Sequence, residues 1–171
     1  MALSIKPYIE NKERIHLIGI GGVSMSALGE LLLSLGVPVS GSDRLKTDVT
    51  ARLESLGAKI TYEHKAENVE GASLIVRTAA VHDDNPEIVR AHALDIPVME
   101  RAEAWGHLMR DYDNVVCLAG THGKTTSTSM MTLMTMEAGL DPTVMVGSNL
   151  PAIGGTLRIG GKGCFVAESC E

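Results

Sequence analysis

The sequence is poor in aromatic residues, in cysteine and in clustered basic residues, and each shortage argues against a class of protein. Only 3% of the 171 residues are aromatic, which argues against base stacking on nucleic acid. The cysteines Cys117, Cys164 and Cys170 are too few for a disulfide framework, and no zinc spacing includes them. The net charge is −6 and no basic run occurs, which argues against binding to nucleic acid or anionic membranes. Without a membrane-length apolar run or a signal-peptide pattern, we expect a soluble cytoplasmic protein.

Short apolar runs alternate with helical patterns along the first two thirds of the chain. This alternation predicts a parallel sheet covered by helices on both faces, a Rossmann-like doubly wound α/β fold. The expected strands are 15–20, 37–40, 58–61, 73–78 and 96–99, and the expected helices are 24–35, 48–56, 86–95 and 101–109.

A polar, turn-prone stretch at 110–114 predicts a domain boundary, with one domain at 1–112 and the beginning of a second at 113–171. The second domain is expected to hold a long helix at 124–138, in which the four methionines between 130 and 136 fill the core. Its expected strands are 115–119 and 144–146, followed by a loop at 147–156 and a hairpin that joins 157–159 to 164–167.

The strongest motif joins the apolar run 115–119 to the long helix of the second domain. It reads Gly120-Thr121-His122-Gly123-Lys124-Thr125-Thr126. Glycines let backbone N–H groups converge on phosphate oxygens, the helix N-terminus adds a positive dipole end, and a lysine can reach the terminal phosphates. The common spacing of a phosphate loop is two residues longer, so an ordinary strand-to-helix turn is the competing interpretation.

An acidic residue is expected near that loop, because a phosphate site usually holds a metal between a hydroxyl and a carboxylate. Glu168 follows the apolar run 164–167, and Glu171 lies just beyond it. The sequence therefore predicts Thr125 and Glu168 as magnesium ligands. The alternative is a pair of solvent-facing carboxylates at the start of a loop.

A second glycine cluster, at 19–24, is an imperfect form of the glycine motif that binds dinucleotides. It ends in Ser24, and Asp43 stands where such proteins carry a carboxylate that binds ribose. We expect an anion of the diphosphate type at this helix N-terminus. A turn without a ligand remains the alternative.

Three stretches of the chain together resemble the Mur ligase family. They are HLIGIGGVSMSALGELLLSLGVPVSGSD, TAAVHDDNPEIVRAHALDIPVMERAE and AGTHGKTTSTSM, and the shortened phosphate loop is a trait of that family. The resemblance implies an N-terminal domain that binds a UDP-sugar, followed by a P-loop domain that binds ATP. It also implies that the chain is a fragment, covering the first domain and the beginning of the second, and we expect no ligation by it alone.

The resemblance also implies roles for individual residues. Gly21, Gly22 and Ser24 would hold the UDP diphosphate, while Asp43, His64, Thr78 and Ala79 would line the uridine or sugar side. Residues 120–126 would bind ATP, with Lys124, Thr125 and Glu168 as the catalytic group and the last two as Mg²⁺ ligands.

The implied reaction joins L-alanine to UDP-N-acetylmuramic acid through an acyl phosphate. Self-association through the second domain is a further expectation. The alternatives are the sibling branch that adds a recycled tripeptide to the same nucleotide sugar, a module that only binds UDP-sugar, and a generic P-loop ATPase.

Overall fold

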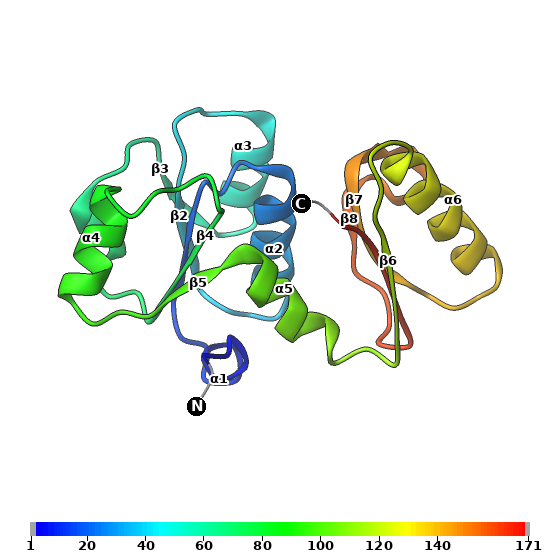
Figure 1. Ribbon diagram of the computed structural model, residues 1–171, viewed down its shortest axis with the longest axis horizontal. Coiled ribbons are helices and arrows are strands. Elements are labelled where there is room, and N and C mark those ends of the chain that lie inside the picture. Colours follow the sequence, from blue (N-terminus) through cyan, green and yellow to red (C-terminus); the bar gives the residue numbers. More distant parts are fainter. Residues whose placement is uncertain (1–2, 170–171) are drawn as a thin grey trace. The chain divides into compact units, whose positions relative to one another are not determined.

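The computed structural model describes residues 3–169, and its internal contacts divide the chain into two compact units (Figure 1). The first unit ends at Leu108 and the second begins at Met109. Glu171 and Cys170 lie outside the described residues. Within residues 3–169, no helix is both long enough and apolar enough to cross a lipid bilayer.

The first unit is built on a five-stranded parallel sheet in the order β3-β2-β1-β4-β5. Its strands are β1 (Ile15–Ile18), β2 (Val39–Ser42), β3 (Lys59–Thr61), β4 (Leu74–Arg77) and β5 (Val98–Glu100). All four residues of β1 and all four of β2 are buried, as expected for central strands with both faces covered. The expected α/β fold with a parallel sheet is confirmed.

The helices of the first unit begin with recognisable capping signals. Thr47 and Thr50 form a reciprocal capping box at the start of α3, and Asn85 caps α4 directly before Pro86. The helical segments are α1 (Lys6–Glu10), α2 (Val23–Ser34), α3 (Asp48–Ser55), a short 3₁₀ turn η1 (Ala66–Val69), α4 (Pro86–Ala93) and α5 (Arg101–Met109). α1 and η1 are absent from the sequence-based prediction, since both are too short to establish a periodic pattern.

Strand boundaries in the first unit differ from the prediction by one or two residues; the fifth strand, for example, is Val98–Glu100 rather than 96–99. The first strand ends at Ile18 because Gly19 turns the backbone with φ of +79°. The second strand lies two residues later than predicted, at Val39–Ser42. It includes Gly41, where a Cβ atom would come within 2.6 Å of the Ile20 side chain. Gly41 thus packs closely against Leu17 of the first strand and against Ile20 just after it, a long-range contact that local propensity does not encode.

The second unit is a four-stranded mixed sheet in the order β6-β9-β7-β8. Its elements are β6 (Asn114–Leu118), α6 (Lys124–Glu137), β7 (Thr143–Leu150), the 3₁₀ turn η2 (Pro151–Ile153), β8 (Gly155–Arg158) and β9 (Cys164–Glu168). β9 runs parallel to both of its neighbours, β6 and β7.

The predicted hairpin between 157–159 and 164–167 is wrong. β8 instead pairs antiparallel with β7, and β9 crosses to lie between β6 and β7. The predicted loop at 147–156 is also wrong, because β7 continues through Leu150 and the turn closes through η2 and Gly154. Apolar alternation identifies strands but leaves their partners open, and a register irregularity between Met145 and Leu150 hides the long strand.

The prediction that the methionines of α6 fill the core is confirmed for Met131, which packs against the cluster that contains Val144 and Val166, and is wrong for Met130 and Met134. The buried face of α6 consists of Thr128, Thr132 and Thr135, whereas Met130 and Met134 are 59% and 64% exposed. Each of the three threonine hydroxyls donates to the backbone carbonyl four residues earlier, at 2.8–2.9 Å. Their polar atoms are thus satisfied within the helix, so the methyl groups can face the sheet.

Candidate functional site

The first unit contains an open cavity of about 670 Å³ at the carboxyl ends of its strands. The residues that directly follow β1, β2 and β4 lie in its wall. The lining consists of Gly19, Asp43, Arg44, Leu45, His64, Thr78, Ala80, Val81, His82, Asp84, Asn85 and Pro86.

The strand order explains why a cavity forms there. The chain leaves β1 to build β2 and β3 on one side, then returns to build β4 and β5 on the other. The connections after β1 and β4 therefore diverge, and ligands of open parallel sheets bind in such a crevice. The cavity therefore lies at the usual ligand-binding position of an open parallel sheet.

The glycine cluster after β1 is held in place by Asp43. Asp43 Oδ2 accepts a hydrogen bond from the Gly21 N–H at 2.8 Å, and Oδ1 accepts one from the Arg44 N–H at 2.7 Å. A Cβ atom at Gly21 would lie 2.8 Å from Asp43 Oδ2, so only glycine allows this close approach. Asp43 thus fixes the turn that leads into α2, besides lining the cavity.

The other predicted residues of the first unit divide into three groups. His64 and Thr78 line the cavity with Asp43, whereas Ala79 is exposed and its neighbour Ala80 forms the wall. Gly21 and Gly22 belong to the turn at the start of α2, outside the lining. Ser24 is buried, and its hydroxyl accepts a hydrogen bond from the Trp105 indole at 3.1 Å.

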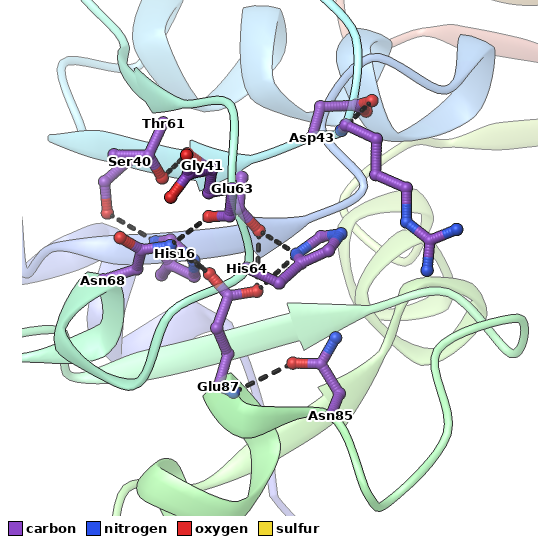
Figure 2. A network of polar contacts seen from close by, with 12 residues as sticks. His16, Ser40, Gly41, Asp43, Thr61, Glu63, His64, Asn68, Asn85 and Glu87 are labelled. Carbon is purple, nitrogen blue, oxygen red and sulfur yellow. Dashed lines mark hydrogen bonds and ion pairs between the residues drawn. The ribbon is translucent and has the colours of Figure 1, made fainter.

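A buried carboxylate, Glu87, lies behind the cavity wall at the start of α4 (Figure 2). One of its oxygens accepts hydrogen bonds from Asn68 at 2.7 Å and from His16 at 3.3 Å. The other oxygen lies 2.7 Å from the Ser42 hydroxyl and 2.8 Å from Nδ1 of His64. Burial by itself would raise the pKa of Glu87, but hydrogen bonds from these four side chains outweigh it and hold the pKa below its ordinary range.

Arg77, the last residue of β4, anchors the loop that forms another part of the wall. Its guanidinium donates to Glu100 on β5 at 2.9 Å, and also to the Val81 carbonyl and to Asp83. Asp83 and the Arg77 guanidinium form an ion pair that lowers the pKa of the Asp83 carboxyl. The loop between β4 and α4 is therefore tied to the sheet by one side chain.

The second unit carries the phosphate-loop motif between β6 and α6. Gly123 caps the helix with a left-handed backbone, φ of +75°, which favours glycine. Nζ of Lys124 donates to the Gly120 carbonyl at 2.6 Å, so the ammonium group folds back over the loop. A cavity of about 230 Å³ opens beside it, lined by Thr121, His122, Gly123, Lys124, Thr125, Thr126 and Glu168.

Glu168 lies at the carboxyl end of β9, directly beside the strand that leads into the loop. Its carboxylate is 7% exposed and accepts hydrogen bonds from the Thr125 hydroxyl at 2.9 Å and the Gly147 N–H at 2.7 Å. A Cβ atom at Gly147 would lie 2.6 Å from Glu168 Oε2, so this site also requires a glycine.

The donor set around Glu168 fits a magnesium ion. Within residues 3–169 no lysine, arginine or histidine forms an ion pair with this buried carboxylate. A carboxylate and a hydroxyl are hard oxygen donors, and Mg²⁺ binds few protein oxygens because water and phosphate complete its shell. Clusters of three or more His, Cys, Asp or Glu side chains suited to a metal do not occur in that range.

The prediction from sequence omitted Glu87, His16 and Arg77. His16 interrupts the otherwise apolar strand IHLI, and a histidine in a buried strand requires a polar partner. That signal predicts a partner, but Glu87 lies 71 residues away in the sequence.

The comparison with known sequences gives a consistent family. Residues 14–113 match the family described as "Mur ligase family, catalytic domain". The chain is 50% identical over 159 residues to the UDP-N-acetylmuramate–L-alanine ligase of Acetivibrio thermocellus. That match covers 93% of this chain and 34% of the relative, so the chain spans about a third of that relative's length.

Solved structures agree with the sequence comparison. The crystal structure of UDP-N-acetylmuramate-alanine ligase from Thermotoga maritima superposes with a TM-score of 0.85 and 37% identity, covering 91% of this chain and 36% of that one. The UDP-N-acetylmuramate:L-alanyl-gamma-D-glutamyl-meso-diaminopimelate ligase of Neisseria meningitides gives a TM-score of 0.83 and 26% identity, covering 91% of this chain and 52% of that one.

Proposed function

Because the chain belongs to the Mur ligase family, we propose that it serves an ATP-dependent ligation that joins L-alanine to UDP-N-acetylmuramic acid. This reaction is a step of peptidoglycan precursor synthesis. The observation that carries the proposal is the 50% identity to a ligase of that name, extending across both units. The tripeptide-adding branch has weaker support, at 26% identity.

We assign the UDP-sugar to the first domain, residues 1–112. Its 670 Å³ cavity is large enough for much of a nucleotide sugar and lies at the switch point of the sheet. In this proposal the turn at Gly21 and Gly22, with the backbone at Ser24, receives the diphosphate at the start of α2. Asp43, His64, Thr78 and Ala79 then belong to the uridine or sugar side.

We assign ATP to the second domain, residues 113–171, where residues 120–126 would cradle its phosphates. Lys124 would exchange the Gly120 carbonyl for phosphate oxygens, which present more negative charge to its ammonium group. Thr125 and Glu168 would hold Mg²⁺, whose chemistry is to neutralise charge on the transferring phosphoryl group.

The proposed chemistry has two balanced steps. A carboxylate oxygen of the muramic acid attacks the γ-phosphorus of ATP, which forms an acyl phosphate and releases ADP. The amine of alanine then attacks the acyl carbon, which forms the amide and releases inorganic phosphate and a proton. The protein's part is to align the attack and to stabilise phosphate charge, so no side chain needs to act as nucleophile.

Isothermal titration calorimetry tests both assignments on the chain as it stands. We expect UDP-N-acetylmuramic acid to bind without ATP, and ATP with Mg²⁺ to bind without the sugar. Gly21→Ala should lower the affinity for the UDP-sugar by roughly tenfold or more, because the added methyl group collides with Asp43. Gly106→Ala is the matched control, since its Cβ would meet no atom within 4 Å.

The alternatives predict different patterns of binding. ATP binding without UDP-sugar binding would favour a generic ATPase, and the reverse would favour a module that only binds UDP-sugar. An assay of amide formation with either alanine or tripeptide as the acceptor, run on a ligase that contains this chain, separates the two sibling branches. Turnover with tripeptide but not with alanine would contradict the proposal.

We further infer a cytoplasmic setting, where ATP is available, and self-association through the second unit. Two features support self-association: the exposed apolar side of α6, with Met130, Leu133 and Met134, and the open edge of strand β6. Light scattering across a concentration series should show association that Met134→Lys reduces. A monomer at all concentrations would contradict this inference.

A further inference from the structure

The carboxylate of Glu87 is fully occupied by hydrogen-bond donors. A carboxylate offers about four acceptor positions, and four side chains fill them: His16, Ser42, His64 and Asn68. The side chain of Glu87 has no exposed surface, and its pKa is held below the ordinary range by these bonds. Glu87 is therefore an ionised acceptor that cannot donate a proton to any neighbour.

This arrangement determines which nitrogen of His64 carries the proton. Nδ1 faces two oxygens, Glu87 Oε2 at 2.8 Å and Ser42 Oγ at 3.0 Å. Glu87 has no proton to give, and the single hydroxyl proton of Ser42 is donated to Glu87. Since an unprotonated Nδ1 would face a negative oxygen at hydrogen-bond distance, Nδ1 must be an N–H group.

The other ring nitrogen of His64 then belongs to the cavity. His64 lines the cavity wall, its side chain is 18% exposed, and Figure 2 shows its second nitrogen on the side away from Glu87. In a neutral ring with a proton on Nδ1, Nε2 carries only a lone pair. It can accept a hydrogen bond from a ligand but cannot donate one.

We propose that Glu87 is a positioning residue that holds His64 in its Nδ1–H form, so that Nε2 accepts a hydroxyl or N–H from the uridine or sugar part of the ligand. The proposal rests on the proposed function, since it concerns how the UDP-sugar lies in its cavity. A lone pair repels phosphate oxygens, so the diphosphate must lie away from His64, toward the glycine turn. Glu87 thereby sets the direction of the ligand without touching it.

The substitution Glu87→Gln should reverse the proton arrangement rather than merely weaken it. The Asn68 amide donates both to Glu87 and to the Glu63 carbonyl, at 2.7 and 2.8 Å, so its orientation is fixed. The oxygen of the new glutamine must therefore face Asn68, and its NH₂ group must face Ser42 and His64. Nδ1 of His64 then becomes the acceptor and Nε2 becomes N–H.

Nitrogen-15 NMR of the imidazole rings at about pH 8.5, where free imidazole is neutral, observes this exchange directly. We expect the His64 signals of the wild-type chain to report a protonated Nδ1, and those of Glu87→Gln a protonated Nε2. The spectrum of His64→Asn assigns the signals by their absence. A purely structural role of Glu87 would leave the tautomer unchanged.

Calorimetry supplies the functional half of the test, with UDP-N-acetylmuramic acid, UDP and inorganic diphosphate as probes. Glu87→Gln should lower the affinity for UDP-N-acetylmuramic acid about tenfold, because one hydrogen bond is lost and two donors are left facing each other. The affinity for inorganic diphosphate should not change. If the affinity for UDP falls by the same factor, the uridine is the donor to Nε2. If only the affinity for UDP-N-acetylmuramic acid falls, the sugar is the donor.

Two further variants keep the test decisive if Glu87→Gln folds poorly. His64→Asn retains an N–H near the Nδ1 position for Glu87 but removes the acceptor Nε2. Its affinity for UDP-N-acetylmuramic acid should therefore also fall about tenfold, while its thermal unfolding temperature changes little. Glu67→Gln, an exposed carboxylate on η1, is the matched control and should bind like wild type.

The outcomes separate the inference from the proposed function. A protonated Nε2 in wild-type His64, or undiminished UDP-sugar binding by both Glu87→Gln and His64→Asn, would overturn the inference while the proposed function stands. Failure of the wild-type chain to bind UDP or the UDP-sugar would overturn the proposed function, and the ligand part of the inference with it.

Discussion

The two units bury their helices in different ways, although each contains a strand that leads through a glycine turn into a helix. α2 of the first unit buries eight of its twelve residues, including Met25, Leu28 and Leu32. α6 of the second unit buries three of fourteen, all threonines, and exposes Met130, Leu133 and Met134. The glycine-to-helix pattern thus predicts a phosphate-binding turn in both units but not how much each helix contributes to stability.

The strands repeat the contrast. β1 is buried along its whole length, whereas in β6 Val115 is 42% exposed and Cys117 is exposed. The centre of the second unit is β9, which is buried throughout and ends in Glu168. We infer that the first unit is stabilised by apolar burial on both sides of its sheet, and that the second concentrates its burial next to the phosphate loop.

Matched truncations in the two helices give the largest expected difference. Leu32→Ala should destabilise the chain by about 2–5 kcal/mol, because Leu32 is fully buried and its loss leaves a cavity. Leu133→Ala should cost less than about 1 kcal/mol, because the side chain is 46% exposed. Urea unfolding measures both, and equal costs would refute the contrast between α2 and α6.

Removal of the loop lysine Lys124 should impair the function assigned to the second unit and spare the function assigned to the first. In a ligase that contains this chain, Lys124→Ala should lower acyl-phosphate formation by about 10²-fold or more and leave UDP-sugar affinity nearly unchanged. Rapid-quench kinetics and calorimetry give the two values. Lys162→Ala, an exposed lysine in the same unit, is the control. Loss of sugar binding with retained ATP chemistry would reverse the assignment of the two glycine loops.

A single methyl group should perturb the second unit at its centre. Gly147→Ala would place a Cβ atom 2.6 Å from Glu168 Oε2, so we expect a loss of about 1–3 kcal/mol of stability and weaker Mg²⁺-dependent ATP binding. Gly163→Ala should be nearly neutral, since its Cβ would meet nothing within 4 Å. Thermal unfolding and ATP titration with and without Mg²⁺ compare the pair. Unchanged ATP binding would argue against Glu168 as a metal ligand.

Low pH should reduce the stability of the first unit through Glu87, and this is the smallest of the four effects predicted for the two units. The pKa of Glu87 in the folded chain lies below its ordinary value of 4.5, since hydrogen bonds outweigh burial. Its contribution to stability is therefore complete above that value and is lost as pH falls through the folded pKa. Urea unfolding of wild type and Glu87→Gln from about pH 6 downward should show a stability difference that shrinks below pH 4.5. A constant difference would contradict this linkage.

Several site residues are predictable because their positions follow from local sequence. Gly123, Lys124 and Thr125 form one contiguous motif, and Glu168 ends an apolar run. Parallel strands align their carboxyl ends, so a residue after one strand approaches the loop after its neighbour. The 2.9 Å hydrogen bond between Thr125 and Glu168 realises that geometry.

The polar network behind the first cavity was not predictable in the same way. His16, His64 and Glu87 come from β1, from the segment after β3 and from α4, and no motif connects them. His16 indicates by its buried strand that it needs a polar partner, but nothing in the local sequence identifies that partner. Their relation emerges only when the sheet brings β1 and β2 together beneath α4.

The sequence by itself determined the features that depend on near neighbours in the chain: the alternation of strands and helices, the two glycine turns, and the caps at Thr47 and Asn85. These follow from backbone conformation and apolar spacing within a few residues. Only the tertiary structure decided that β9 lies between β6 and β7, that α6 turns its threonines inward, and that Glu87 stays ionised. Each of those outcomes depends on which distant groups share a buried space, because burial and the satisfaction of polar atoms are properties of the packed chain.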